Sequence, residues 1–271
     1  QPPCLNDAAT GLVDCGNWAE SASWNTGSAL SGVYVAVLRR PDTGGIGHVY
    51  FVVREDGHAS QVLFQTNDTT WQAYNFFGRS LYGGLYTTDR ARAVSYNRPF
   101  VTLARTVQFF SDQYPMIRFL ERNGYDVTYV SGVDTARRPA ELRLHQLFVS
   151  AGHDEYWSGD QRANVEAARD AGVNLAFFSG NEVFWKTRWQ PSIDGTGTPY
   201  RTMVCYKETL DGAKTDPSPQ WTGNPPAPPW STGTAPGRWS PGPRRSAGTA
   251  APRRRSSRCS PPPASAPWRS S

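Results

Sequence analysis

Two clusters of polar and aromatic residues directly follow two apolar runs, and they hold most of the side chains that could do chemistry. Residues 147–150 lead into GHDEYW at 152–157, and residues 173–179 lead into GNEVFW at 180–185. Carboxylates and imidazoles held in a cleft can transfer protons in a hydrolytic reaction. Four residues are therefore catalytic candidates: His153, Asp154, Glu155 and Glu182. Aromatic and amide side chains in these clusters and in TTWQAYN at 69–75 are candidates for substrate binding: Trp71, Tyr74, Asn75, Trp157 and Asn181.

The same residues also have purely structural interpretations. The aromatic pair at 156–157 can plug the end of a strand, and the polar pair at 153–154 can cap the loop that follows. Glu182 can pair with Lys186 or Arg188 on the next turn of a helix. Trp71 is of a type that more often packs in a core than against a substrate.

The segment between the two clusters predicts a helix. Ser158 and Gln161 have the spacing of a capping box, and Gly172 suits the left-handed residue that ends many helices. A strand, a helix and a strand in this order form a βαβ unit with parallel strands. Because ligands of open parallel sheets bind outside the carboxyl ends of the strands, both clusters should lie at one functional edge.

The wider pattern predicts a doubly wound, flavodoxin-like α/β fold with a parallel sheet. Its expected strands and helices alternate along the chain: 60–65, 115–123, 126–130, 139–144, 147–150, 159–171 and 173–179. The almost unbroken apolar run at 173–178 predicts the most buried strand. Two β-branched and aromatic runs, 32–39 and 48–54, predict a hairpin that could be the end of a β-sandwich. We expect a β-rich segment at 1–57, an α/β domain at 58–223 and a tail at 224–271.

The charge of the chain is concentrated in that tail. Residues 224–271 hold eight arginines, twelve prolines and no acidic residue, and without them the chain has 20 basic and 23 acidic residues. A segment without aliphatic side chains cannot bury a core, so we expect disorder. An Arg-rich arm could bind nucleic acid, but the abrupt change in composition favours a frameshift product with no function. We expect neither a nucleic-acid nor a membrane partner, and the oligomeric state is not predicted.

Cys4 and Cys15 lie close together in a segment rich in Gly, Asp and Asn. They could close a small loop as a disulfide, or both could be free thiols. A disulfide would indicate an oxidising compartment, which favours an extracellular or cell-surface location.

Four motifs give the chain a resemblance to a known family: GHDEYWS, FFSGNEVFWKTRW, TTWQAYN and SYNRPF. Over roughly residues 30–222 the chain resembles the C-terminal domain of the N,N-dimethylformamidase large (beta) subunit family, and most closely its secreted multidomain relatives. The resemblance implies a metal-assisted hydrolase that cleaves an amide C–N bond in a small molecule. It also implies a central sheet like that of glutamine amidotransferase-like domains, and a mononuclear iron held by two tyrosines and a glutamate.

Carried over residue by residue, the resemblance implies Tyr114 and Tyr156 as the two tyrosine ligands. The nearest match to the glutamate is Gln220, and Glu182 could take its place. We therefore expect Tyr114, Tyr156 and the 180–185 turn to share one cleft. Two other functions compete: a non-catalytic carbohydrate- or surface-binding module, and a cysteine-dependent amidotransferase. The turn at 179–182 has no cysteine, which argues against the second.

Overall fold

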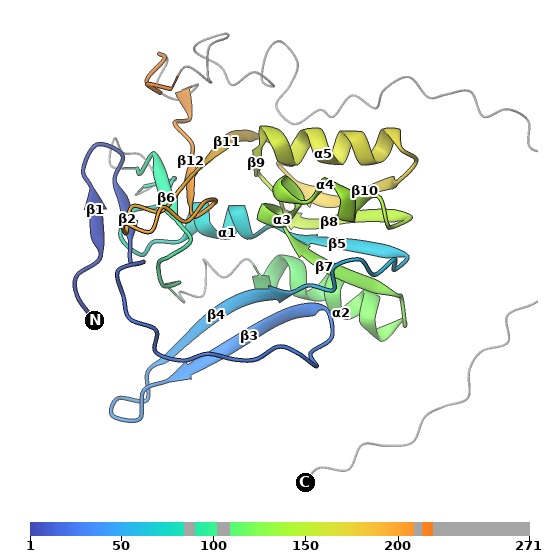
Figure 1. Cartoon of the computed structure of the whole chain (residues 1–271), viewed down its shortest axis with the longest axis horizontal. Coiled ribbons are helices and arrows are strands. Elements are labelled where there is room, and N and C mark those ends of the chain that lie inside the picture. The colour runs from blue at the N-terminus through green and yellow to red at the C-terminus, as the bar shows by residue number, and fades with distance from the viewer. Residues whose placement is uncertain (84–89, 102–108, 209–212, 219–271) are drawn as a thin grey trace, which may run out of the picture. The chain divides into compact units, whose positions relative to one another are not determined.

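A four-stranded parallel sheet forms the centre of the chain (Figure 1). The computed structural model describes residues 1–83, 90–101, 109–208 and 213–218. The tail at 224–271 and Gln220 lie outside these residues. The strands run in the order β10-β8-β5-β7 and all neighbours are parallel: Asn174–Gly180, Leu147–His153, Val62–Thr66 and Val127–Ser131. The α/β fold with a parallel sheet is thus confirmed.

Four helices alternate with these strands, and three of them were predicted. They are α2 (Tyr114–Arg122), α3 (Gly132–Arg137), α4 (Pro139–Leu142) and α5 (Gly159–Asp170). The capping box at the start of α5 is confirmed. The Ser158 side chain accepts from the backbone N–H of Gln161, and the Gln161 side chain accepts from the backbone N–H of Ser158. Helix α3, which was not predicted, begins with a second capping box at Ser131. Among the described helices, none is long and apolar enough to cross a membrane.

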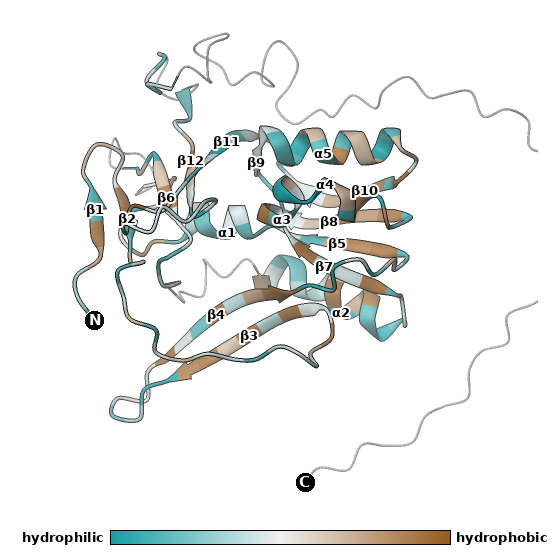
Figure 2. Cartoon of the chain, in the orientation of Figure 1, coloured by the Kyte–Doolittle hydropathy of each residue, from teal (hydrophilic) through white to brown (hydrophobic). Residues whose placement is uncertain are grey.

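One face of the sheet is covered by α2 together with the predicted hairpin. The hairpin strands are β3 (Gly32–Arg39) and β4 (Ile46–Val53). Ile117 and Leu120 of α2 join Phe64 and Val149 of the sheet in one buried cluster, and hairpin side chains such as Val33 pack against it. In Figure 2 the hydrophobic colour is concentrated on these strands. Whatever lies beyond the chain, this hairpin helps to build the core of the α/β domain.

The prediction that 173–178 is the most buried strand is wrong. Strand β10 is at the edge of the sheet, and Phe178 is 62% exposed. Within the parallel sheet, the strand that is buried throughout is β5, where all five residues are buried although two of them are polar. Composition therefore does not tell a central strand from an edge strand. The position in the sheet decides the burial.

A second, mixed sheet lies beside the first and was not predicted. Its order is β6-β12-β11-β9: Ala93–Ser95, Thr202–Val204, Trp185–Gln190 and Tyr156–Ser158. Three of these strands have only three residues, too few for an alternating pattern to show. Strand β9 is parallel to β11 and places Tyr156 opposite Trp185. Both residues come from the clusters singled out in the sequence, so this sheet brings the two clusters together.

Three smaller elements remain, and one of them is the π-helix η1 (Phe109–Gln113), directly before α2. Helix α1 (Asp68–Tyr74) follows β5 directly and carries the TTWQAY residues. At the N-terminus, β1 (Leu5–Asp7) and β2 (Leu12–Asp14) pair antiparallel, and Cys4 forms a disulfide with Cys15. Of the two alternatives that the sequence left open for these cysteines, the structure shows the disulfide.

Candidate active site

Glu155 is the centre of a densely connected polar group at the carboxyl edge of the parallel sheet. It lies between β8 and β9 and is 1% exposed. One carboxylate oxygen accepts from the Tyr74 hydroxyl at 2.9 Å, and the other from the Tyr82 hydroxyl at 2.7 Å. The indole nitrogen of Trp185 donates to the carboxylate at 3.0 Å. A buried carboxylate needs this many donors, because leaving it unpaired would cost several kcal/mol.

The backbone of Glu155 is also fixed on both sides. Its N–H donates to the Thr70 hydroxyl of α1 at 3.0 Å, and its carbonyl accepts from the N–H of Trp185 at 2.8 Å. The loop after β8 is therefore tied to α1 and to β11. These bonds hold the carboxylate in one orientation, as a catalytic or metal-binding group requires.

Tyr74 and Tyr82 form a stacked pair over the carboxylate, with ring centroids 4.3 Å apart. Burial and the charge of Glu155 raise the pKa of both phenols. Both hydroxyls are therefore neutral donors in this structure. With the carboxylate they form a buried set of oxygen atoms from two tyrosines and one glutamate.

A buried cation faces the same aromatic group. The ammonium of Lys207 lies 3.5 Å from the ring centroid of Tyr82 and 5.0 Å from that of Tyr156. Lys207 is 3% exposed, and burial lowers its pKa to about 8. It follows β12 with a φ of +52°, a backbone conformation that costs energy outside glycine. Its charge opposes that of Glu155 in a site with little access to water.

His153 links this group to the more exposed side of the loop. Its Nε2 lies 2.9 Å from the side-chain nitrogen of Asn181 and 3.8 Å from the carboxylate of Glu155. The imidazole is partly exposed, and its ring lies 5.9 Å from that of Tyr74. Asn181 has a φ of +53°, in the turn after β10. The structure thus brings together four sequence candidates: His153, Glu155, Tyr74 and Asn181.

Other catalytic candidates point elsewhere. Asp154 is fully buried and accepts from Gln65 and Ser150, inside the polar layer beneath the start of α5. Burial raises its pKa to about 7. Glu182 accepts from the hydroxyl of Ser179 at 2.7 Å and so closes its own turn. Both side chains serve local structure in these contacts.

The remaining substrate-binding candidates pack in cores or organise loops. Trp157 packs against Phe148 and Phe177 of the parallel sheet. Trp71 packs against aromatic rings of the hairpin and of the turn before α2. Asn75 donates to the carbonyl of Pro99 and accepts from two backbone N–H groups. Their contacts agree with the structural interpretations.

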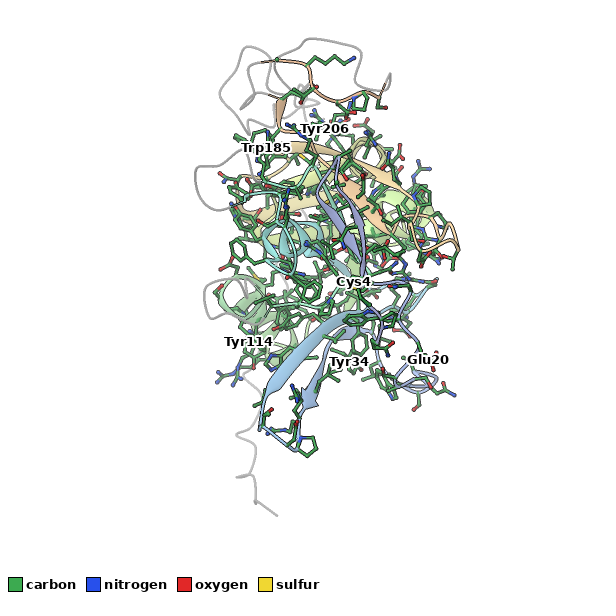
Figure 3. All side chains as sticks on the ribbon, turned by 90° about the vertical axis from the view of Figure 1, so that its left-hand side faces the viewer. Cys4, Glu20, Tyr34, Tyr114, Trp185 and Tyr206 are labelled. Atoms are coloured by element: carbon green, nitrogen blue, oxygen red, sulfur yellow. A yellow bond between two sulfur atoms is a disulfide. The ribbon has the colours of Figure 1, made fainter. Side chains whose placement is uncertain are left out.

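The two tyrosines implied as ligands have separate surroundings. Tyr156 is fully buried, with its ring beside those of Tyr74 and Tyr82. Tyr114 is 40% exposed, and its hydroxyl accepts from Arg118. In Figure 3 Tyr114 lies well away from Trp185, the strand partner of Tyr156. No described contact joins Tyr114, Tyr156 and Glu182, and their joint role as metal ligands stays a prediction.

The donor set around Glu155 fits such an ion better. Among the described residues, no three His, Cys, Asp or Glu side chains are grouped to hold a metal. The oxygens of Tyr74, Tyr82 and Glu155 do converge, however, and hard oxygen donors suit a hard cation. They also match the residue types that the resemblance implies, at different positions.

Sequence reasoning missed Tyr82 and Lys207. Tyr82 lies in a Gly-, Tyr- and Arg-rich stretch, where the lack of periodicity gave no reason to choose one tyrosine. Lys207 lies in MVCYKET, which has no motif. A lysine is found in a site of this kind only once its burial is known.

Comparison with known protein families shows which family the chain matches. It matches the family described as N,N-dimethylformamidase beta subunit-like, C-terminal, over residues 1–250. The match includes the N-terminal hairpins as well as the α/β domain. No curated protein matches the chain. The chain therefore belongs to the N,N-dimethylformamidase beta subunit-like, C-terminal family.

Proposed function

We propose that this domain hydrolyses an amide C–N bond of a small molecule at the group formed by Glu155, Tyr74, Tyr82, Lys207 and His153. The observation that carries the proposal is the buried carboxylate of Glu155, held by two phenols and an indole N–H. This carboxylate lies at the carboxyl edge of a parallel sheet, which is where ligands of such sheets bind. Family membership supports the reaction class.

An iron ion would be held by the oxygens of Tyr74, Tyr82 and Glu155. Bound there, it would supply Lewis-acid activation of an amide carbonyl and of a water molecule. The buried Trp185 N–H would keep the carboxylate oriented, and the Lys207 charge would offset the negative charge of the ligands. The structural support for iron is the convergence of these oxygens.

His153 is the side chain best placed to move a proton. It is partly exposed and lies beside Glu155, and the Asn181 amide nitrogen lies 2.9 Å from its Nε2 and must release this nitrogen before it takes a proton. In the proposed reaction the imidazole takes a proton as water adds to the carbonyl carbon. It gives the proton to the nitrogen as the C–N bond breaks, so that an amine and a carboxylic acid leave.

Two finer assignments belong with this proposal. The strand order β10-β8-β5-β7 supports a flavodoxin-like sheet, whose order reverses between β5 and β8. Glu155 follows β8, and α1 with Tyr74 follows β5, so the site would lie at that reversal. The Cys4–Cys15 disulfide supports an extracellular or cell-surface location.

Release of ammonia from formamide and acetamide, and of an amine from N-methylformamide and N,N-dimethylformamide, tests the function. Glu155→Gln should lower kcat/KM at least about 100-fold with its circular dichroism spectrum unchanged, because a neutral amide cannot replace the carboxylate. Glu166→Gln is the matched control, since Glu166 pairs with Arg162 on the surface of α5. Wild-type chain inactive on all four amides, or an active Glu155→Gln, would contradict the proposal. A non-catalytic binding module would then be the better account.

A further inference from the structure

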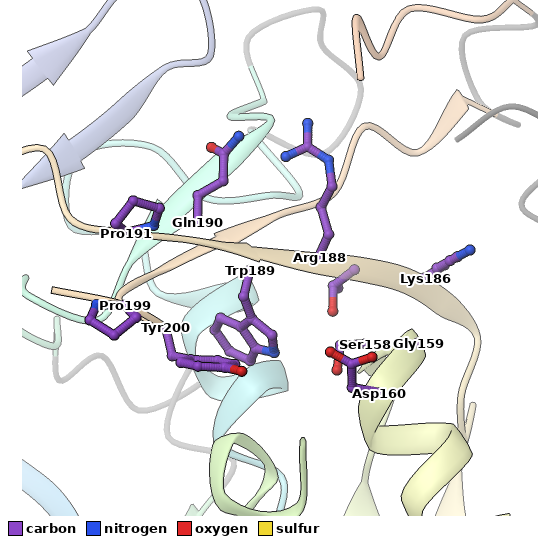
Figure 4. Close-up of a pocket in the computed structure, with 11 residues that line it drawn as sticks. Ser158, Gly159, Asp160, Lys186, Arg188, Trp189, Gln190, Pro191, Pro199 and Tyr200 are labelled. Atoms are coloured by element: carbon purple, nitrogen blue, oxygen red, sulfur yellow. The ribbon is translucent and has the colours of Figure 1, made fainter. Parts of the chain in front are cut away.

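A separate cavity of about 390 Å³ lies between β11 and the start of α5 (Figure 4). Its size is in the range of small-molecule sites, roughly 300–1,000 Å³. The residues around it come from β11, from the first turn of α5 and from the loop at 191–200. Glu155, Tyr74, Tyr82 and Lys207 do not line it. The cavity is therefore not part of the proposed amidase site.

Two buried polar atoms at this cavity have no hydrogen-bond partner among the described protein groups. They are the hydroxyl of Thr187 and the indole nitrogen of Trp189. Thr187 is 1% exposed. Buried polar groups are nearly always paired, because leaving one unpaired costs about 1–3 kcal/mol in a folded protein. Two such groups beside one cavity indicate that it takes a polar ligand.

Aromatic rings form another part of the cavity wall. Trp189 and Tyr200 have ring centroids 6.0 Å apart. Figure 4 shows Trp189 on the side of β11 that faces Asp160, with Arg188 and Gln190 on the other side, as the alternation of a strand requires. Arg188 is bound to the buried Asp216 at 2.9 Å. The ring of Trp189 and the carboxylate of Asp160 therefore both lie in the wall of the cavity.

The cavity wall carries charges of both signs, which disfavours an ionic ligand. Asp160, at the start of α5, would repel an anion, and Lys186 of β11 would repel a cation. A neutral molecule with several hydroxyls and one apolar face satisfies the donors, the carboxylate and the rings. A sugar ring has this chemistry, because its C–H face packs on aromatic rings and its hydroxyls both donate and accept.

Tyr200 also lines a second cavity of about 660 Å³, so the two cavities share a wall. Its φ of +60° is strained for a residue with a side chain, and such strain is concentrated at functional sites. The larger cavity has unpartnered polar atoms of its own, Trp71 Nε1 and Gln72 Oε1. We propose that the smaller cavity binds one pyranose ring of a neutral carbohydrate, and that further sugar units extend past Tyr200 into the larger cavity.

Calorimetric titration of the full chain with D-glucose, N-acetylglucosamine, cellobiose, maltose and diacetylchitobiose tests this proposal. At least one disaccharide should bind saturably and more tightly than its monosaccharide. Thr187→Val and Trp189→Phe should each weaken binding about tenfold, because each removes one hydrogen bond to the ligand. Thr128→Val is the matched control: its hydroxyl is also buried and unpartnered, but Thr128 lines neither cavity.

Each result decides the proposal. Loss of affinity in Thr187→Val and Trp189→Phe, with wild-type affinity in Thr128→Val, supports it. Amide hydrolysis should be the same in Thr187→Val as in the wild type, since the two sites are separate. No saturable binding of any of the five sugars overturns the proposal. Binding that is equal in all three variants and the wild type also overturns it, because the sugar would then lie elsewhere.

Discussion

Asp68 makes the stability of the domain depend on pH in a predictable direction. Its carboxylate is buried at the start of α1, where it accepts from the hydroxyls of Thr66 and Tyr96 and from the N–H of Gly132. Burial outweighs these bonds and raises its pKa from 3.8 to about 6. The ionised carboxylate therefore costs roughly 3 kcal/mol relative to the unfolded chain, at about 1.4 kcal/mol for each pKa unit.

The sign follows from the raised pKa. Between about pH 4 and about pH 6 the folded chain holds a proton that the unfolded chain has lost, so stability falls as the pH rises through this window. Asp68 then makes the domain more stable at about pH 5 than at about pH 7.5, by about 1.4 kcal/mol. Asp68→Asn removes this contribution, because an amide does not titrate. The variant should also gain stability relative to wild type at the higher pH.

Urea unfolding of wild type and Asp68→Asn at the two pH values measures the effect. The comparison between variants is needed, because Asp154 also has a raised pKa and adds a trend of the same sign. Asp170→Asn is the control, since Asp170 is an exposed partner of Arg169 and should leave the pH trend unchanged. A pH trend in Asp68→Asn equal to that of the wild type would refute the argument.

Three further changes test the fold. Reduction of Cys4–Cys15 should cost about 3 kcal/mol of unfolding free energy in a denaturant titration, from the entropy of a loop of about a dozen residues; a midpoint that does not move would contradict this. Phe64→Ala in β5 should cost roughly 3–5 kcal/mol and Phe178→Ala at the exposed edge below about 1 kcal/mol; the reverse order in thermal unfolding would exclude the described sheet order. Gly152→Ala should destabilise the domain by about 1–3 kcal/mol, because Gly152 has a φ of +89° and an added Cβ would lie 2.8 Å from the Cβ of Asp112. A melting temperature equal to that of the wild type would contradict the described backbone conformation at Gly152.

The sequence predicted the parallel sheet well, because its signals are local. Ser158, Gln161 and Gly172 mark both ends of α5, and apolar runs mark β8 and β10. Whether a strand is central or at the edge depends on its neighbours in space. The apolar residues of β10 therefore led to the wrong expectation about burial.

The candidate site was predicted in part for a similar reason. His153, Glu155 and Asn181 follow strands that end at one edge, and topology brings such residues together. Tyr82 bonds to Glu155 and Lys207 lies over the Tyr82 ring, and both contacts join segments more than fifty residues apart that show no periodic pattern. Lys207 also follows β12, a strand of only three residues, which is too short for an alternating pattern to show.

The identity of the tyrosines around the proposed iron is the most direct test of the site. Iron content and the tyrosinate-to-iron absorption band should be measured in four variants with matched chemistry: Tyr74→Phe, Tyr82→Phe, Tyr114→Phe and Tyr156→Phe. The account predicts that the first two lose iron and the band, because their oxygens lie on the carboxylate of Glu155 at 2.9 and 2.7 Å. It predicts that the last two keep both. Loss of iron in Tyr114→Phe with full retention in Tyr74→Phe and Tyr82→Phe would contradict it.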